Sequence, residues 1–206
     1  MSRAPLLWRA AVEHNSQNTF IKNSCTGLSL IETLCTLAIL SILVATAAPN
    51  LAIFSANTEL RTTTQELKNS LSLARQYAIT NASIIHICAI NSQDQNKCKD
   101  NTQFNSNWSN GWIVYSDDNA NNQYDDSDTL IQKNTNNKRI AIVFNQRGRL
   151  RFFPDGSSRS AGFYLCNANI TETNHIRLLF SGRSRVAKTS NQRHQIICNS
   201  TIEKNI

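Results

Sequence analysis

Apolar positions concentrate in residues 28–48 (LSLIETLCTLAILSILVATAA), a run that carries a single charge, Glu32. At roughly 1.5 Å per residue, a helix over this run is about 30 Å long, which is enough to cross the hydrocarbon core of a bilayer. The pattern therefore predicts a membrane-spanning helix near the N-terminus.

Beyond Pro49 the apolar positions follow helical spacing, and polar residues fill the opposite side. One stripe stays on a single helical face and consists of Leu60, Leu67, Leu71, Ala74 and Ala78. We expect one long helix that ends near Thr80, is kinked at Pro49, and packs this stripe against a globular head.

After Asn81 the pattern changes to short segments rich in β-branched and aromatic residues, separated by Asn, Asp, Gly and Ser clusters. Nine strands are predicted, at residues 83–90, 111–115, 129–132, 140–144, 149–153, 162–166, 175–180, 183–188 and 194–198. The segments 91–110 and 117–137 are expected to be long Asn-rich loops. The predicted fold is α+β, with the long N-terminal helix packed on an antiparallel β-rich head.

Composition limits this head to one ordinary core, because the chain has 206 residues and 40% hydrophobic content. The formal charge of +7 is unevenly distributed: residues 138–206 carry +9, whereas residues 59–137 carry −3. The basic C-terminal third favours an anionic partner such as nucleic acid.

Three interpretations of the N-terminal run compete. A secretory signal peptide could use Ala45-Thr46-Ala47 as its cleavage site, but the apolar run is long for one. A plain membrane anchor leaves Glu32 unexplained, because a carboxylate at bilayer depth costs on the order of 2.5–3.5 kcal/mol on insertion scales.

The third interpretation accounts for the glutamate. Gly27-Leu28-Ser29-Leu30-Ile31-Glu32, followed by the apolar run and Ala48-Pro49-Asn50, resembles the prepilin signature of type IV pilins and type II secretion pseudopilins. The resemblance implies cleavage after Gly27 by a prepilin peptidase and methylation of the new N-terminus, Leu28. It also implies that Glu32 faces the terminal amine of a neighbouring subunit, which would supply the cation that a buried carboxylate needs.

This resemblance divides the chain into a leader (1–27), a transmembrane and assembly helix (28–48), a second helix half (49–80) and the head (81–206). It implies a single-pass protein of the bacterial inner membrane with its head in the periplasm. After assembly the protein would lie in a type IV pilus at the cell surface, at or near the tip.

Three further segments narrow the resemblance. Their order is Gly111-Trp112-Ile113-Val114, then Phe152-Phe153-Pro154-Asp155-Gly156, then Gly182-Arg183-Ser184-Arg185. In this order they resemble the FimT/GspH group of minor pilins. DNA-binding members of that group carry a Gly-Arg-x-Arg motif, which Gly182, Arg183 and Arg185 match.

Four of the six cysteines belong to the head, and four cysteines allow three pairings. We favour Cys88 with Cys98 and Cys166 with Cys198, since both pairs join neighbours along the chain, as suits an oxidising periplasm. A zinc site is the alternative, although no C-x-x-C spacing occurs. No cofactor is expected, and the four histidines form no spaced catalytic set with an acid and a nucleophile, so we expect no enzymatic activity.

The acidic loop from Asp117 to Asp128 places oxygen ligands at the spacing of a calcium loop. Position 6 is Asn122 rather than Gly, and position 12 is Asp128 rather than Glu. A solvated Asx-rich turn between two strands is the competing interpretation, and it is the one we favour.

Arginines are the candidate DNA-binding groups. Arg147, Arg149 and Arg151 alternate along a predicted strand, which would place them on one face, while Arg183, Arg185 and Lys188 lie near the end of the head. Guanidinium groups match phosphate oxygens, and Gly182 would let the backbone approach a ligand. The alternative is a solvated hairpin with scattered arginines.

Two functional classes follow from these patterns. A filament-tip pilin would capture extracellular double-stranded DNA for natural transformation through phosphate contacts. A structural or priming subunit of a pilus or type II secretion pseudopilus would share the fold without any nucleic-acid role. In both classes the partners include other major and minor pilins, the prepilin peptidase and the inner membrane.

Overall fold

The computed structural model describes residues 27, 29–99, 102–136 and 139–189, without the side chains of residues 46–49 and 189. Residues 1–26 of the leader, Leu28 and the predicted strand 194–198 lie outside the described residues. One helix, α1 (Leu30–Asn81), precedes the strands. These are β1 (Ile85–Ala89), β2 (Ser106–Asn107), β3 (Gly111–Ser116), β4 (Thr129–Thr135), β5 (Ile140–Phe144), β6 (Leu150–Phe152), β7 (Ala161–Asn167), β8 (Thr173–Leu178) and β9 (Ser184–Thr189).

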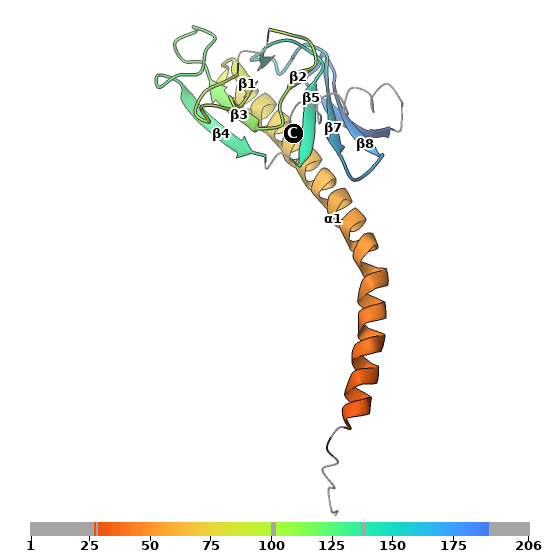
Figure 1. Cartoon of the computed structure of the whole chain (residues 1–206). Coiled ribbons are helices and arrows are strands. Elements are labelled where there is room, and N and C mark those ends of the chain that lie inside the picture. The colour runs from red at the N-terminus through yellow and green to blue at the C-terminus, as the bar shows by residue number, and fades with distance from the viewer. Residues whose placement is uncertain (1–26, 28, 100–101, 137–138, 190–206) are drawn as a thin grey trace, which may run out of the picture. The chain divides into compact units, whose positions relative to one another are not determined.

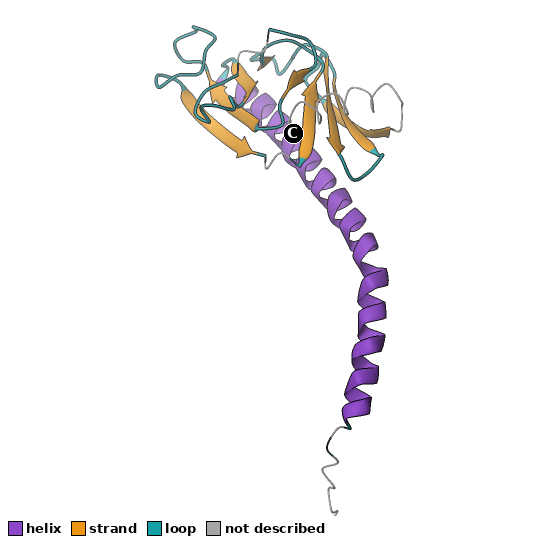
Figure 2. Ribbon diagram, viewed as in Figure 1, coloured by secondary structure: helices purple, strands orange, loops and turns teal. Residues whose placement is uncertain are grey.

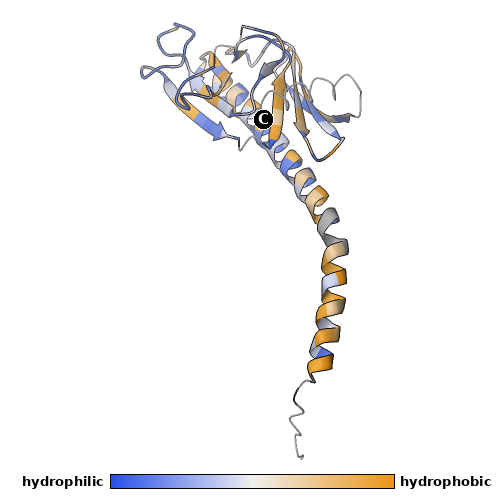
Figure 3. Ribbon diagram, viewed as in Figure 1, coloured by the Kyte–Doolittle hydropathy of each residue, from blue (hydrophilic) through white to orange (hydrophobic). Residues whose placement is uncertain are grey.

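The chain divides into two units after Val44, and the first unit contains the start of α1. Large apolar side chains of this segment are exposed, including Leu30 at 77% and Ile42 at 65%, and Figure 3 shows the hydrophobic colour that dominates here. Among the described residues no single helix is long and apolar enough to cross a membrane, but Leu30–Ala45 and Asn50–Asn81 meet that criterion as a bent pair. The predicted kink at Pro49 falls where side chains are not described and stays a prediction.

In the second unit, the rest of α1 supplies the centre of the core. All five residues of the predicted stripe are buried, and Leu67, Leu71, Ala74 and Ala78 are completely inaccessible. They belong to one cluster with Trp108, Phe144 and Phe163, whose rings lie 4.6–5.1 Å apart between centroids. This part of α1 runs along the strands in Figure 1, and the prediction of a packed apolar stripe is confirmed.

Two antiparallel sheets pack on the helix (Figure 2). The first has the order β4-β3-β1-β6, and the second has the order β2-β5-β7-β8-β9. Strands β1, β3 and β5 are buried along their whole length, which explains why they read as continuous apolar runs rather than alternating patterns. The α+β fold with an antiparallel head is therefore as predicted.

Two local predictions were wrong. Strand β2 lies within the expected loop 91–110, where Ser106 and Asn107 carry no strand pattern and pair with Phe144 and Val143 of β5. The predicted strand 149–153 is reduced to β6, because residues 145–148 form a bend and Gly148 adopts a φ of +66°. Both differences arise from pairing and turn geometry, which periodicity does not report.

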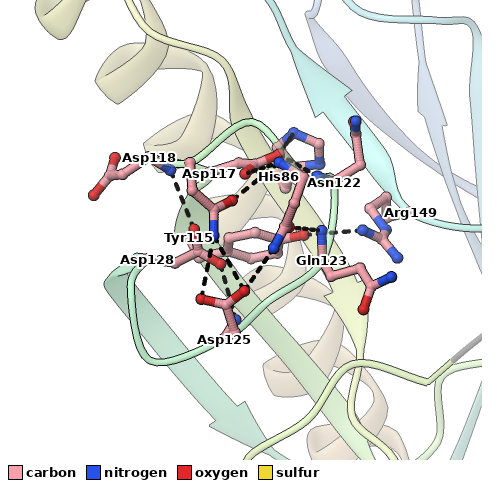
Figure 4. Close-up of polar contacts among 11 residues, drawn as sticks. His86, Tyr115, Asp117, Asp118, Asn122, Gln123, Asp125, Asp128 and Arg149 are labelled. Atoms are coloured by element: carbon pink, nitrogen blue, oxygen red, sulfur yellow. Dashed lines mark hydrogen bonds and ion pairs between the residues drawn. The ribbon is translucent and has the colours of Figure 1, made fainter.

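His86 on β1 links the first sheet to the acidic loop (Figure 4). Its ring is 2% exposed, stacks on Tyr115 at 5.2 Å between centroids, and has Nε2 at 3.6 Å from Oδ2 of Asp117. Burial lowers the pKa of His86 to about 4, helped by Arg149 and Arg151 and opposed by Asp117. The folded head therefore holds this imidazole in its neutral form.

Two strands of the head carry disulfide-bonded cysteines. Cys88 on β1 is bonded to Cys98 and closes the loop between them. Cys166 on β7 is also disulfide-bonded. Cys198, its partner in the sequence prediction, lies outside the described residues, so that pairing stays a prediction.

Thiol labelling will test the cysteine assignment. The denatured, non-reduced mature chain should be labelled at Cys35, which is a free cysteine on α1, and at none of Cys88, Cys98, Cys166 and Cys198. Peptide mass spectrometry locates the label. Free thiols at all four head cysteines, with stoichiometric zinc, would contradict the two-disulfide prediction.

A second prediction concerns acid stability. Because the pKa of His86 is lower in the folded state than its ordinary value of 6.5, the unfolded chain binds the proton first as pH falls. The stability from neutral His86 is complete above about pH 6.5 and is lost as pH falls towards 4. The loss in unfolding free energy should reach about 3 kcal/mol.

Urea unfolding of the full chain in detergent at several pH values measures this loss. His86→Phe is the control, since a phenyl ring can still stack on Tyr115 but cannot titrate. We expect the variant to lose less stability than the wild type over the same pH interval. Identical pH profiles for the two proteins would show that His86 does not determine the acid sensitivity.

Candidate nucleic-acid interface

The Gly-Arg-x-Arg segment forms the tight turn between β8 and β9. The N–H of Gly182 donates to the carbonyl of Leu179 at 2.9 Å, and the N–H of Leu179 donates to the carbonyl of Arg183 at 3.0 Å. Gly182 has a φ of +72°, and a Cβ there would lie 2.0 Å from the carbonyl oxygen of Gly156. Glycine is required here by backbone conformation and by the close approach of a second turn.

Arg75 on α1 fixes this arrangement. Its Nε donates to the carbonyl oxygens of Gly156 at 3.1 Å and Ser181 at 3.2 Å, and so joins two turns that lie far apart in the sequence. Arg183 and Arg185 project from the anchored turn and are exposed. The hydrogen bonds of Arg75 thus hold the backbone of the turn that carries the guanidinium groups of Arg183 and Arg185, and Arg75 acts as a positioning residue.

A groove of about 550 Å³ lies between this turn and α1. Its lining includes Lys68 and Arg75 from the helix and Arg183 and Arg185 from the turn and the start of β9, and no Asp or Glu. Lys68 and Arg75 could not be predicted as part of this site from the sequence, because more than 100 residues separate them from the motif. Their one sequence signal was a spacing of seven residues, which places two cations on one helical face.

Strands β8 and β9 carry further basic residues near this groove, and one of them is neutralised by an acidic partner. Arg177 on β8 is exposed and is paired in register with Arg185 on β9, so both side chains lie on the same face. Lys188, by contrast, donates from Nζ to Oε2 of Glu172 at 3.0 Å. Of the predicted basic groups at this end of the head, Lys188 is therefore the one with an acidic partner among the described residues.

The predicted alignment of Arg147, Arg149 and Arg151 along one strand is wrong, because β6 begins at Leu150. Arg147 lies in the preceding bend with its guanidinium 4.2 Å from the centre of the Phe104 ring. The Nη1 of Arg149 donates to the hydroxyl of Tyr115 at 3.4 Å.

Arg159 nevertheless connects the backbone of Arg147 to that of Arg149. Its Nη2 donates to the carbonyl oxygens of Arg147 and Arg149 at 2.6 and 2.7 Å. Partial burial, followed by repulsion from Arg151, lowers the pKa of Arg159. The β5–β6 bend and β6 thus carry a basic cluster that is built by contacts and not by strand alternation.

The acidic loop forms a dense network of its own hydrogen bonds (Figure 4). The carboxylate of Asp117 accepts from the N–H groups of Asn121 and Asn122, and Asp125 accepts from the Asn121 side chain at 2.6 Å. Hydrogen bonds from Ser127 first, then from Asn121 and Asn119, lower the pKa of Asp125 to about 2. The loop oxygens are thus engaged by amide and hydroxyl donors, as in an Asx-rich turn.

No cluster of three or more His, Cys, Asp and Glu side chains that could hold a metal ion occurs within the described ranges. Of the histidines, His86 is buried against Tyr115, and His175 stacks on Tyr164 at 4.6 Å between centroids.

Family comparisons agree with this architecture. Residues 63–193 match the family described as type II transport protein GspH. Residues 22–48 match the prokaryotic N-terminal methylation motif, which implies a hydrophobic N-terminal anchor in the membrane. No curated protein matches the chain.

Among solved structures, the chain is similar to two crystal forms of the type IV minor pilin FimU of Pseudomonas aeruginosa strain PAO1. In one form the identity is 16% and the TM-score 0.45, over 62% of this chain and 92% of FimU. In the other the identity is 17% and the TM-score 0.47, over 65% and 92%.

The GspH match covers more than half of the chain and includes the buried half of α1, both sheets and the Gly-Arg-x-Arg turn. The methylation motif ends at residue 48, before that match begins. This chain therefore belongs to the GspH family and is a type IV pilin-like protein with an N-terminal methylation motif.

Proposed function

We propose that this minor pilin binds extracellular double-stranded DNA for uptake in natural transformation, by contacts to phosphate without recognition of base sequence. The observation that carries the proposal is the anchored turn at Gly182, which presents Arg183 and Arg185 to solvent on a fixed backbone. Neither guanidinium has an ion-pair partner among the described residues. Guanidinium groups bind phosphate oxygens through two parallel N–H donors.

Other basic groups extend this surface in the proposal. Arg147, Arg149 and Arg151 contribute through the cluster that Arg159 holds together. Lys188 contributes less, since its contact with Glu172 must be exchanged for one with phosphate. The charge balance of +9 over residues 138–206 attracts the polyanion over a longer range.

The N-terminal segment supports the same role by placing the head outside the cytoplasm. In the proposal the prepilin peptidase cleaves after Gly27, Leu28 becomes the methylated N-terminus, and Glu32 pairs with the terminal amine of a neighbouring pilin. Glu32 lies in the first turn of α1 among exposed apolar side chains. The chain then stays in the inner membrane until it enters a pilus, where a tip position would present the head to DNA.

A structural subunit of a type II secretion pseudopilus is the second candidate, favoured by the description of the matching family as a type II transport protein. The two candidates share the fold and the N-terminal processing. They differ in whether Arg183 and Arg185 bind DNA, and that difference decides between them.

Processing is the first prediction here. The membrane-bound protein purified from a bacterial host with a prepilin peptidase should begin at Leu28 and carry a methylated amine. Intact-mass and N-terminal peptide spectra measure this. A chain that begins at Ala48, or that retains Met1, would contradict the assignment of Gly27 as the cleavage position.

The second prediction of this section concerns DNA binding by the Gly-Arg-x-Arg motif. Changing Arg183 and Arg185 together to Gln removes two cations and keeps polar side chains. Each phosphate contact on duplex DNA contributes about −0.9 to the slope of log affinity against log salt concentration. Loss of two contacts should therefore make this slope less negative by about 1.8. Fluorescence anisotropy of the full mature chain in detergent with random-sequence duplex measures affinity and slope.

A melting curve of the double variant must show an intact head, so that a loss of binding is a loss of contacts. Unchanged affinity and slope in a folded variant would show that the motif does not bind DNA. A wild-type chain that binds no duplex even at low salt would leave the structural pseudopilin role in its place.

A further inference from the structure

The groove between α1 and the β8–β9 turn holds more positive charge than the motif alone provides. Lys68 and Arg75 enter it from the helix, opposite Arg183 and Arg185. None of these four residues forms an ion pair with any residue that the structure describes. Like charges gathered in one groove without counter-charge repel one another, and a bound polyanion relieves that repulsion.

The helical side of the groove is regular and rigid. Lys68, Ser72, Arg75 and Gln76 follow one another at spacings of four, three and one residues, which keeps them on one face of α1. The adjacent face of the same turns carries the buried residues Leu67, Leu71 and Ala74. Packing of that face holds the backbone of the groove in place, so binding orders only side chains.

Arg75 is already partly oriented for an anion. Its Nε is used by the carbonyl oxygens of Gly156 and Ser181, whereas the remaining N–H groups of its guanidinium have no hydrogen-bond partner among the described residues. A guanidinium fixed through Nε loses little further freedom when its outer donors bind phosphate.

We propose that this groove is a binding site for the phosphodiester backbone of DNA, in which Lys68 and Arg75 contact phosphate together with Arg183 and Arg185. The inference rests on the proposed function and extends its site from the turn to the helix. Arg75 and the two motif arginines supply paired donors, and Lys68 supplies a mobile point charge. Ser72 and Gln76 add neutral donors for phosphate oxygens.

The size of the groove fits this ligand. A volume of about 550 Å³ lies in the range of small-molecule sites and accommodates a short stretch of backbone, not the width of a duplex. Such a site touches phosphate and sugar and leaves the base edges unread. Four phosphate contacts predict a slope of log affinity against log salt of about −3.6 from this groove.

Lys68→Gln tests the helical side, and Lys97→Gln is the matched control. Both changes remove one lysine charge from the head, but Lys97 lies outside the groove and contacts Asp94. With full mature chain in detergent and a random duplex of roughly 30 base pairs, Lys68→Gln should flatten the salt slope by about 0.9. Affinity at about 50 mM salt should fall about tenfold, whereas Lys97→Gln should leave the slope unchanged.

A second measurement needs no variant. Acetylation of the wild-type chain, followed by peptide mass spectrometry, should show that bound duplex protects Lys68 and leaves Lys97 as reactive as before. Lysine protection reports contact directly, so it remains informative if Lys68→Gln alters folding.

The outcomes separate this inference from the proposed function. If wild-type chain binds DNA through Arg183 and Arg185, but Lys68→Gln behaves like Lys97→Gln and Lys68 stays reactive, the groove is not the phosphate site and the proposed function stands. If the wild-type chain binds no DNA, both fall together. If Lys68→Gln flattens the salt dependence of binding and bound duplex protects Lys68 from acetylation, the groove is established as the phosphate site.

Discussion

The packing of one helical stripe against two sheets is the interaction on which the head depends. Leu67, Leu71, Ala74 and Ala78 are completely buried, and burial of each of the two leucine side chains contributes about 1.5–3 kcal/mol relative to exposure. The sheets are separate, with orders β4-β3-β1-β6 and β2-β5-β7-β8-β9. Residues of both sheets share one core cluster with the helix, which therefore acts as their common support.

The same helix organises the basic surface. Arg75 lies one position beyond the buried Ala74, so the packing that fixes the stripe also fixes the direction of its guanidinium. Through Gly156 and Ser181 it holds two turns at the end of the head. The motif arginines are thus positioned by the core, which explains how a turn at the protein surface can present charge on a defined backbone.

The N-terminal part of α1 has the opposite character. Its large apolar side chains are exposed, which suits a segment whose partners are lipid and the helices of other pilins. Membership of the GspH family and the methylation motif imply that anchor and that association. One helical sequence is therefore adapted to two environments. Its first part has apolar residues all round, as suits lipid, and its second part has a single apolar stripe that packs on the head.

The sequence by itself determined the elements whose cause is local. Periodicity predicted α1 and its buried stripe, and short apolar runs predicted most strands, since these patterns follow from which face must leave water. Only the tertiary structure decided the rest. Strand β2 exists because Phe144 and Val143 of β5 offer backbone partners to Ser106 and Asn107. The bend at Gly148 separates Arg147 from β6. Lys68 and Arg75 join Arg183 and Arg185 in one groove because chain folding, and not sequence spacing, sets the distances between charges.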